Sequence, residues 1–311
     1  MASPVRPIVT PSQGSEKLGI GLVFGSALVW SFGGALARFL PDLDSWTIVF
    51  YRGLFAALFL LGFMLLRDGL KSTVMMFRNM GWPGLFVATS FAIASTCFIL
   101  AIGYTTVANV ILIQAGVPLL AALMAWIFFR EHISLFTWGA IFAVIVGVGF
   151  MVSESLGAGS EAHPLAYIGD LLALAIALVF AGTTVVTRRY THVRMTPAAC
   201  FGALIACSIA ATQAPGFSVS GFQTGILFLL GAFNLGLGMA LFVTGARLIP
   251  SPLVALLGTC ETVLSPLWVA LVHGEIPGQR TIIGGIFVVV ALLAYLSLQM
   301  RRAQETKAST S

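Results

Sequence analysis

The stretch LLGTCETVLSPLWVALVHGE, residues 256–275, places one carboxylate inside an apolar run. The formally charged residues nearest to Glu261 along the chain are Arg247 and Glu275, so the interval between them can cross a bilayer, which takes about 20 mostly apolar residues. A charged side chain that faces lipid costs at least about 2.5 kcal/mol, and it usually faces a cavity or a partner instead. The stretch therefore predicts a membrane-spanning helix with one face turned to the protein interior.

The composition of the whole chain agrees with this reading. Hydrophobic residues make up 59% of the sequence and charged residues 9%, whereas soluble domains usually carry about 25% charged residues. This excess, with a mean hydropathy of +1.01, is too large for one buried core and predicts a polytopic membrane protein. The net charge of +5 does not indicate a nucleic-acid partner, because the basic residues lie between the apolar runs rather than in a cluster.

The run lengths predict an all-α membrane protein with ten transmembrane helices. Strands are not expected, because a barrel strand needs only about 10 alternating residues. Residues 1–17, which are polar and rich in proline, are expected to be a disordered tail, and residues 300–311 a second tail. The expected spans are 18–39, 45–66, 82–102, 107–129, 135–152, 165–187, 196–213, 222–244, 251–273 and 280–299.

The distribution of basic residues gives the spans a direction. One set of span ends and tails carries 13 lysines and arginines, and the opposite loops carry Arg280 alone. Arg38 and Arg52 fall within spans. Because basic loops stay in the cytoplasm, the asymmetry predicts a multi-pass protein of the cell (inner) membrane with both termini in the cytoplasm.

The two halves of the chain resemble each other. They flank the Gly/Ser-rich segment 153–164, which is expected to be an outer linker between a first repeat, 18–152, and a second repeat, 165–299. Five spans per repeat is an odd number, so the second copy must insert upside down, as in many secondary transporters that bind substrate near the midplane between the repeats. The aligned pairs are 25–38 with 172–188, Glu131 with Glu275, and 139–145 with 284–290.

Two prolines occupy corresponding spans of the repeats. Pro118 lies in the fourth span and Pro266 in the ninth. A proline inside a helix frees a carbonyl group and bends the axis, so the pair predicts helix kinks beside a binding site. The alternative is that neighbouring helices simply tolerate both prolines.

Three motifs carry a family resemblance: WSFGG at 30–34, YRGLFAALFLL at 51–61, and Glu261 followed fourteen residues later by Glu275 within HGEIPGQRTIIGG. With these motifs the chain resembles the ten-span EamA-like branch of the drug/metabolite transporter superfamily over residues 18–299. Thr262 replaces the family's proline after the first glutamate, and Val117 replaces the glutamate before Pro118. The resemblance implies a carrier, often an exporter, of amino acids or other small metabolites, and it does not fix the substrate.

Glu261 is the main candidate for the substrate-binding site. It lies ten residues into the ninth span, about 15 Å along a helix that crosses about 30 Å of hydrocarbon, and therefore near the midplane. It could hold a substrate ammonium group, or it could take up and release a proton and so couple transport to a proton gradient. The alternative is a structural carboxyl that joins helices through hydrogen bonds.

Arg52, seven residues into the second span, is the second charged candidate. It could bind a substrate carboxylate, but the family motif favours a gating or structural ion pair, with Asp42 or Asp44 within reach. Arg38 is expected to extend its side chain toward the membrane surface. The remaining substrate-binding candidates are Gln114, Asn234, Trp30, Ser90, Thr184 and Phe180.

Other classes of function lack their signatures. The four histidines lie at span ends or in loops, and the sequence has no metalloprotease, nucleophile-elbow or phosphate-loop motif, so neither catalytic residues nor a metal or other cofactor are expected. A passive channel stays open as an alternative, as does a carrier of phosphorylated metabolites, although such substrates favour two or more midplane cations and Arg52 is one. Gly21 and Gly25 form a Gly-x-x-x-Gly pair that would allow a homodimer.

Overall fold

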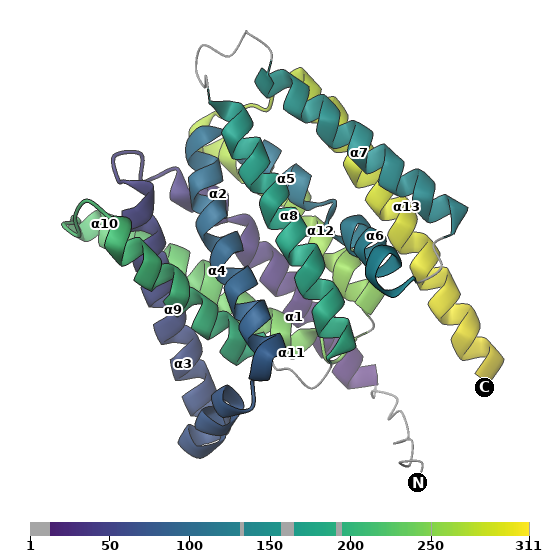
Figure 1. The fold of residues 1–311 in the computed structure, drawn as a ribbon, viewed down its shortest axis with the longest axis horizontal. Coiled ribbons are helices and arrows are strands. Elements are labelled where there is room, and N and C mark those ends of the chain that lie inside the picture. The colour runs from purple at the N-terminus through teal and green to yellow at the C-terminus, as the bar shows by residue number, and fades with distance from the viewer. Residues whose placement is uncertain (1–12, 131–133, 157–164, 191–194, 250, 311) are drawn as a thin grey trace.

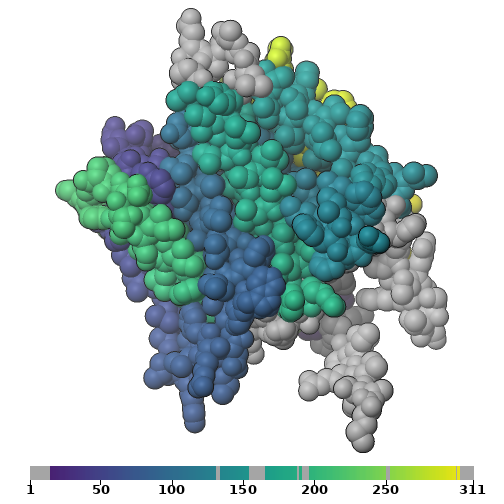
Figure 2. All heavy atoms as spheres, in the orientation of Figure 1, coloured from purple at the N-terminus to yellow at the C-terminus, as the bar shows by residue number. Residues whose placement is uncertain are grey.

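The computed structural model describes residues 13–130, 134–156, 165–190, 195–249 and 251–310, and within these ranges the chain is helical with no strand. In these described ranges, ten helical spans are long and apolar enough to cross a membrane. They pack as a bundle that both views show (Figures 1 and 2). The elements are α1 (Gln13–Ser31), α2 (Gly33–Ala37), α3 (Ser45–Arg78), α4 (Gly81–Tyr104), α5 (Val107–Gln114), α6 (Val117–Phe129), α7 (Leu135–Leu156), α8 (Ala166–Arg189), α9 (Met195–Gln213), α10 (Gly221–Phe228), the π-helix η1 (Leu229–Leu237), α11 (Gly238–Gly245), α12 (Ser251–His273) and α13 (Gln279–Thr310).

The ten predicted spans are confirmed, with three of them interrupted. The first span breaks at Phe32 into α1 and α2, and the fourth breaks at Ala115 and Gly116 into α5 and α6. The eighth span passes through η1. Runs of apolar residues predict that a helix crosses the membrane, whereas such breaks depend on partners elsewhere in the chain.

The expected tails are partly helical. The helix α1 already begins at Gln13 and α13 continues to Thr310, so the prediction of a disordered tail up to residue 17 was too long. Residues 1–12 and most of the expected linker, 157–164, lie outside the described residues. The helix α3 also runs past the expected span to Arg78, with a break at Gly69, whose φ of 77° is one that glycine adopts readily.

The packing of the helices follows the internal repeat. The first five spans correspond in order to the last five. If each span is replaced by its counterpart in the other repeat, each of the closely packed helix pairs becomes another closely packed pair. Thus α4 packs on α8 as α1 packs on α11, α4 packs on α9 as α3 packs on η1, and α1 packs on α12 as α6 packs on α8. The pairs α3–α9 and α7–α13 map onto themselves and flank the bundle in Figure 1. The two-repeat architecture expected from the sequence is therefore present.

The α7–α13 pair is held by two glycines that face each other. A Cβ added to Gly147 would lie 2.7 Å from the carbonyl oxygen of Gly284, and one added to Gly284 would lie 2.5 Å from that of Gly147. The two backbones can approach this closely because neither residue has a side chain. This contact fixes the fifth span against the tenth.

We expect Gly147→Ala to lower the melting temperature of the purified protein in detergent, because overpacking a tight contact costs about 1–3 kcal/mol. Gly149→Ala, two residues along the same helix, is the matched control, since its added Cβ meets no atom within 4 Å. Thermal melts followed by size-exclusion chromatography measure both. Equal melting temperatures would contradict the close packing of α7 on α13.

The candidate dimer motif packs partly within the chain. A Cβ on Gly21 would meet no atom within 4 Å, but one on Gly25 would lie 3.8 Å from the Leu241 side chain of α11. Half of the pair therefore already faces a neighbouring helix of the same chain. A homodimer through this motif stays a prediction.

Candidate functional site

A cavity of about 420 Å³ lies between the two repeats. Its wall is mostly apolar and includes the aromatic residues Phe91, Phe98, Phe180 and Phe242, with Trp30 at one side. Residues from both repeats line it, as expected for a site on the pseudo-symmetry axis. The polar lining residues are Arg52, Ser95, Gln114, Thr183, Thr184, Asn234, Thr259, Glu261 and Thr262.

Glu261 faces this cavity from α12. It is the eleventh residue of a 23-residue helix and is half-buried. Among the residues that the structure describes, no hydrogen-bond donor and no cation pairs with its carboxyl group. A carboxyl group that is short of partners and lines a mostly apolar cavity can accept a ligand ammonium group or a proton.

Arg52 faces the same cavity from α3 and is 6% exposed. Its Nη1 donates to the carbonyl oxygen of Ser95 at 3.2 Å and to Ser95 Oγ at 2.7 Å, and its guanidinium carbon lies 5.4 Å from the centre of the Phe98 ring. Its Nε has no hydrogen-bond partner among the described residues. The guanidinium group is thus held in place by neutral groups and retains a free donor.

The expected ion pair of Arg52 is not found among the residues that the structure describes. Asp44 instead caps α3, where its carboxylate accepts the backbone N–H groups of Trp46 and Thr47. Asp42 is exposed, and neither of the salt bridges between described residues involves Arg52. The local demand for an N-terminal helix cap takes the nearest carboxylate away from the arginine.

Asn234 joins the π-helix to the broken first span. Its Nδ2 donates to the carbonyl oxygen of Val29 at 2.7 Å and to that of Trp30 at 3.1 Å, just before the break at Phe32. Carbonyl groups near a helix end lack regular partners, and π-helical turns often lie at functional sites. Asn234 therefore lines the cavity while it supports the end of α1.

The other predicted binding residues divide into two groups. Trp30 and Phe180 both line the cavity, as do Gln114 and Thr184. The last two already bond to their own helices, since Gln114 Nε2 donates to Val110 O and Thr184 Oγ1 to Phe180 O. Ser90 is buried and is not among the lining residues, because the face of α4 that lines the cavity runs through 87, 91, 94, 95 and 98 and Ser90 lies beside it.

The two prolines behave differently. Pro118 lines the cavity as the second residue of α6, directly after the break at Gly116. Pro266 lies inside α12, which is assigned as one helix from Ser251 to His273. Interruptions were expected in the fourth and ninth spans. The fourth span is interrupted and the ninth is one helix, whereas the first span has a break that was not expected.

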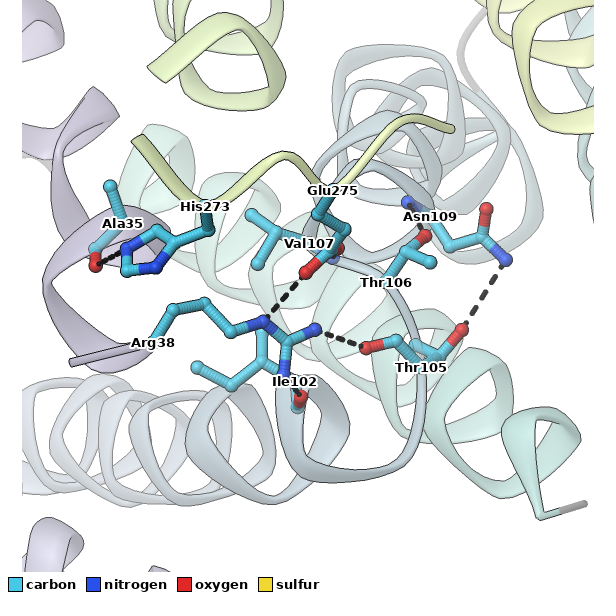
Figure 3. A network of polar contacts seen from close by, with 9 residues as sticks. All are labelled: Ala35, Arg38, Ile102, Thr105, Thr106, Val107, Asn109, His273 and Glu275. Atoms are coloured by element: carbon cyan, nitrogen blue, oxygen red, sulfur yellow. Dashed lines mark hydrogen bonds and ion pairs between the residues drawn. The ribbon is translucent and has the colours of Figure 1, made fainter. Parts of the chain in front are cut away.

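Contacts between the two repeats cross one end of the bundle, which we call the Glu275 end. There a polar network joins Arg38, Thr105, Val107, Asn109 and Glu275, as Figure 3 shows. Arg38, which the sequence predicted to reach toward the membrane surface, bonds instead to Glu275 at 2.7 Å. The lining residues nearest to this network, Ile111 among them, are buried.

At the opposite end, which we call the Arg67 end, part of the lining is exposed or half-buried, while Val87 and Ala199 are buried. Thr184 is exposed there, and Phe242, Ala255 and Gly258 are half-buried. All four lie in the halves of α8, α11 and α12 that approach this end. The most exposed residues of the lining thus lie toward the Arg67 end, and the polar network lies at the Glu275 end.

Several site residues could not have been found by sequence reasoning. Ser95, Thr259 and the aromatic residues Phe91, Phe98 and Phe242 look like any membrane-helix residues, and the spacing of the α4 stripe was the one available signal. Within the described residues, no cluster of three or more histidine, cysteine, aspartate or glutamate side chains could hold a metal ion.

Comparison with known proteins gives matches of two kinds, to a family model and to solved structures. The model of the EamA-like transporter family matches twice, over residues 17–153 and 167–297. One solved structure, described only as "Crystal structure of protein", covers 91% of this chain and 97% of its own, with a TM-score of 0.64 and 18% identical residues. At that identity the likeness shows a shared fold. The search of curated protein sequences finds no match.

Proposed function

Because the chain belongs to the EamA-like transporter family, with one copy of the family's unit in each half, we propose that it is a secondary, alternating-access transporter of a small zwitterionic metabolite such as an amino acid. The direction we favour is export or exchange. The substrate passes through the cavity between the repeats. The members of this family are membrane transporters of small solutes. Our proposal adds the substrate, the mechanism and the direction of transport.

One observation carries the proposal: the same cavity presents a carboxyl group and a guanidinium group that do not pair with each other. Among the described residues, Glu261 has no partner, and Arg52 has no carboxylate partner and bonds to the neutral Ser95. Charges in an apolar site that lack protein partners are expected to meet them on a ligand. A zwitterion supplies an ammonium group for Glu261 and a carboxylate for Arg52, while its side chain fits the aromatic wall.

The proposal includes an orientation. Arg67, Arg189 and Arg301 lie on the side that we place in the cytoplasm, together with both termini. With this orientation the Glu275 end faces outward, and we infer that the cavity opens toward the cytoplasm in the conformation described. An exporter loads its substrate from that state. Proton coupling belongs to the same proposal, because Glu261 could exchange the substrate for a proton.

The two alternatives fit less well. A carrier of phosphorylated metabolites would need several cations, and Arg52 is the one arginine or lysine among the described lining residues. A passive channel needs a continuous path, whereas the polar network crosses the Glu275 end. The closed end favours a carrier that exposes its site to one side at a time.

We expect purified protein in liposomes to show counterflow, in which unlabelled amino acid inside accelerates entry of the same labelled amino acid. Amino acids are tested first, with and without a pH gradient, and protein-free liposomes are the control. Carrier exchange saturates with substrate. Flux that neither saturates nor responds to internal substrate would contradict the carrier and favour a channel.

A further inference from the structure

The Glu275 end is held by an ion pair between the repeats. Arg38 Nε donates to Glu275 Oε2 at 2.7 Å, so the arginine that follows α2 in the first repeat is bound to the loop after α12 in the second. The two side chains are 23% and 22% exposed. Such a pair is sheltered enough to be strong, yet water can reach it, so its separation need not leave two charges in a dry interior.

Each partner also caps a helix end. Arg38 Nη1 donates to Ile102 O at 2.6 Å and Nη2 to Thr105 O at 3.0 Å, at the C-terminus of α4. Glu275 Oε1 accepts the N–H of Val107, the first residue of α5, at 2.9 Å. A cation at a helix C-terminus and an anion at a helix N-terminus both favour their positions. Figure 3 shows both caps converging on the ion pair.

Further contacts join α2 and α12, the two helices that precede Arg38 and Glu275. Phe32 stacks on Trp268 with ring centres 4.9 Å apart, and a ring nitrogen of His273 lies 2.9 Å from Ala35 O. These contacts connect α2 to the part of α12 that follows Pro266. The first span is broken at Phe32, and Pro266 leaves α12 without one backbone hydrogen bond, so each element has a point at which its axis can bend.

We propose that Arg38 and Glu275 form a latch that closes the Glu275 end of the cavity, and that their separation opens the cavity to that side. The latch lies directly above the cavity, since Ile111 lines the cavity one helical turn from Val107. Because Arg38 and Glu275 belong to different repeats, a movement of one repeat against the other must break the pair. The inference deepens the proposed alternating-access function and rests on it.

The test is labelling of a cysteine below the latch. Ile111→Cys is introduced where the four native cysteines, Cys97, Cys200, Cys207 and Cys260, are replaced by alanine. An impermeant maleimide is applied to membrane vesicles of either orientation. In this background Arg38→Ala and Glu275→Ala are each expected to raise the labelling rate from the Glu275 end about tenfold and to lower it from the Arg67 end, because the loss of a charge-assisted bond shifts the balance of conformers.

The double variant Arg38→Ala with Glu275→Ala is expected to label no faster than either single variant if the two side chains act as one latch. Arg280→Ala is the matched control, since this arginine lies at the same end but is exposed and bonds to Ser153. Melting temperatures of all variants are measured in parallel, and Glu275→Gln replaces Glu275→Ala if the latter does not fold.

The outcomes separate the latch from the proposed function, because labelling requires no substrate. Unchanged labelling from the Glu275 end in folded variants would overturn the latch and leave the carrier intact. Faster labelling from both ends together with a lower melting temperature would also overturn it, in favour of a structural role. Equal labelling from both ends before any latch change would overturn the latch and the alternating-access carrier together.

Discussion

Replacement of Glu261 by glutamine is expected to reduce counterflow at least about tenfold while the protein still folds. Glutamine keeps the shape of the side chain but removes its charge. A hydrogen bond to a charged group contributes about 1.5–3 kcal/mol, and 1.4 kcal/mol corresponds to a tenfold change. Initial rates in liposomes at several substrate concentrations measure the effect.

The control is Glu16→Gln, which makes the same chemical change at an exposed carboxylate in the first turn of α1. It should transport at the unaltered rate. If Glu261 also carries the proton, Glu261→Gln should abolish the response to a pH gradient. Full counterflow by a folded Glu261→Gln protein would refute both the ammonium-binding and the coupling role.

Replacement of Arg52 by glutamine is expected to reduce transport selectively, by at least about tenfold for substrates that carry a carboxylate. The guanidinium group of Arg52, the one arginine or lysine among the described lining residues, is the group proposed to meet that carboxylate. The amine that lacks the α-carboxylate of the best substrate should be unaffected or should become the better substrate. Competition of both compounds against the labelled substrate measures the ratio.

The matched control is Arg67→Gln, on the same helix, where the arginine is exposed and bonds to the adjacent Asp68. A general loss of transport for amine and amino acid alike in Arg52→Gln would show that Arg52 supports the fold through Ser95 rather than the substrate. Together with Glu261→Gln, this result assigns each end of the zwitterion to one side chain.

The candidate site was only partly within reach of the sequence. Six of the predicted substrate-binding residues line the cavity, and their role in binding stays a prediction: Trp30, Gln114, Phe180, Thr184, Asn234 and Glu261. Ser90 was expected to line the cavity and does not. The helix α4 is apolar on most sides, so its sequence does not show which side faces the cavity. Ser95 was not singled out, because its role depends on Arg52, which lies 43 residues away.

The sequence by itself determined the ten membrane spans and the two-repeat organisation. Both depend on apolar runs of sufficient length, on the residues that flank them and on the order of matched motifs, all of which are local properties of the chain. The tertiary structure alone decided which arginine is paired. Arg38 and Arg52 are both arginines within apolar spans, yet one bonds to Glu275 and the other has no carboxylate partner among the described residues. The difference arises because Glu275 lies 237 residues from Arg38, and only the packing of one repeat on the other brings an acid and a base so distant in the chain within hydrogen-bonding distance.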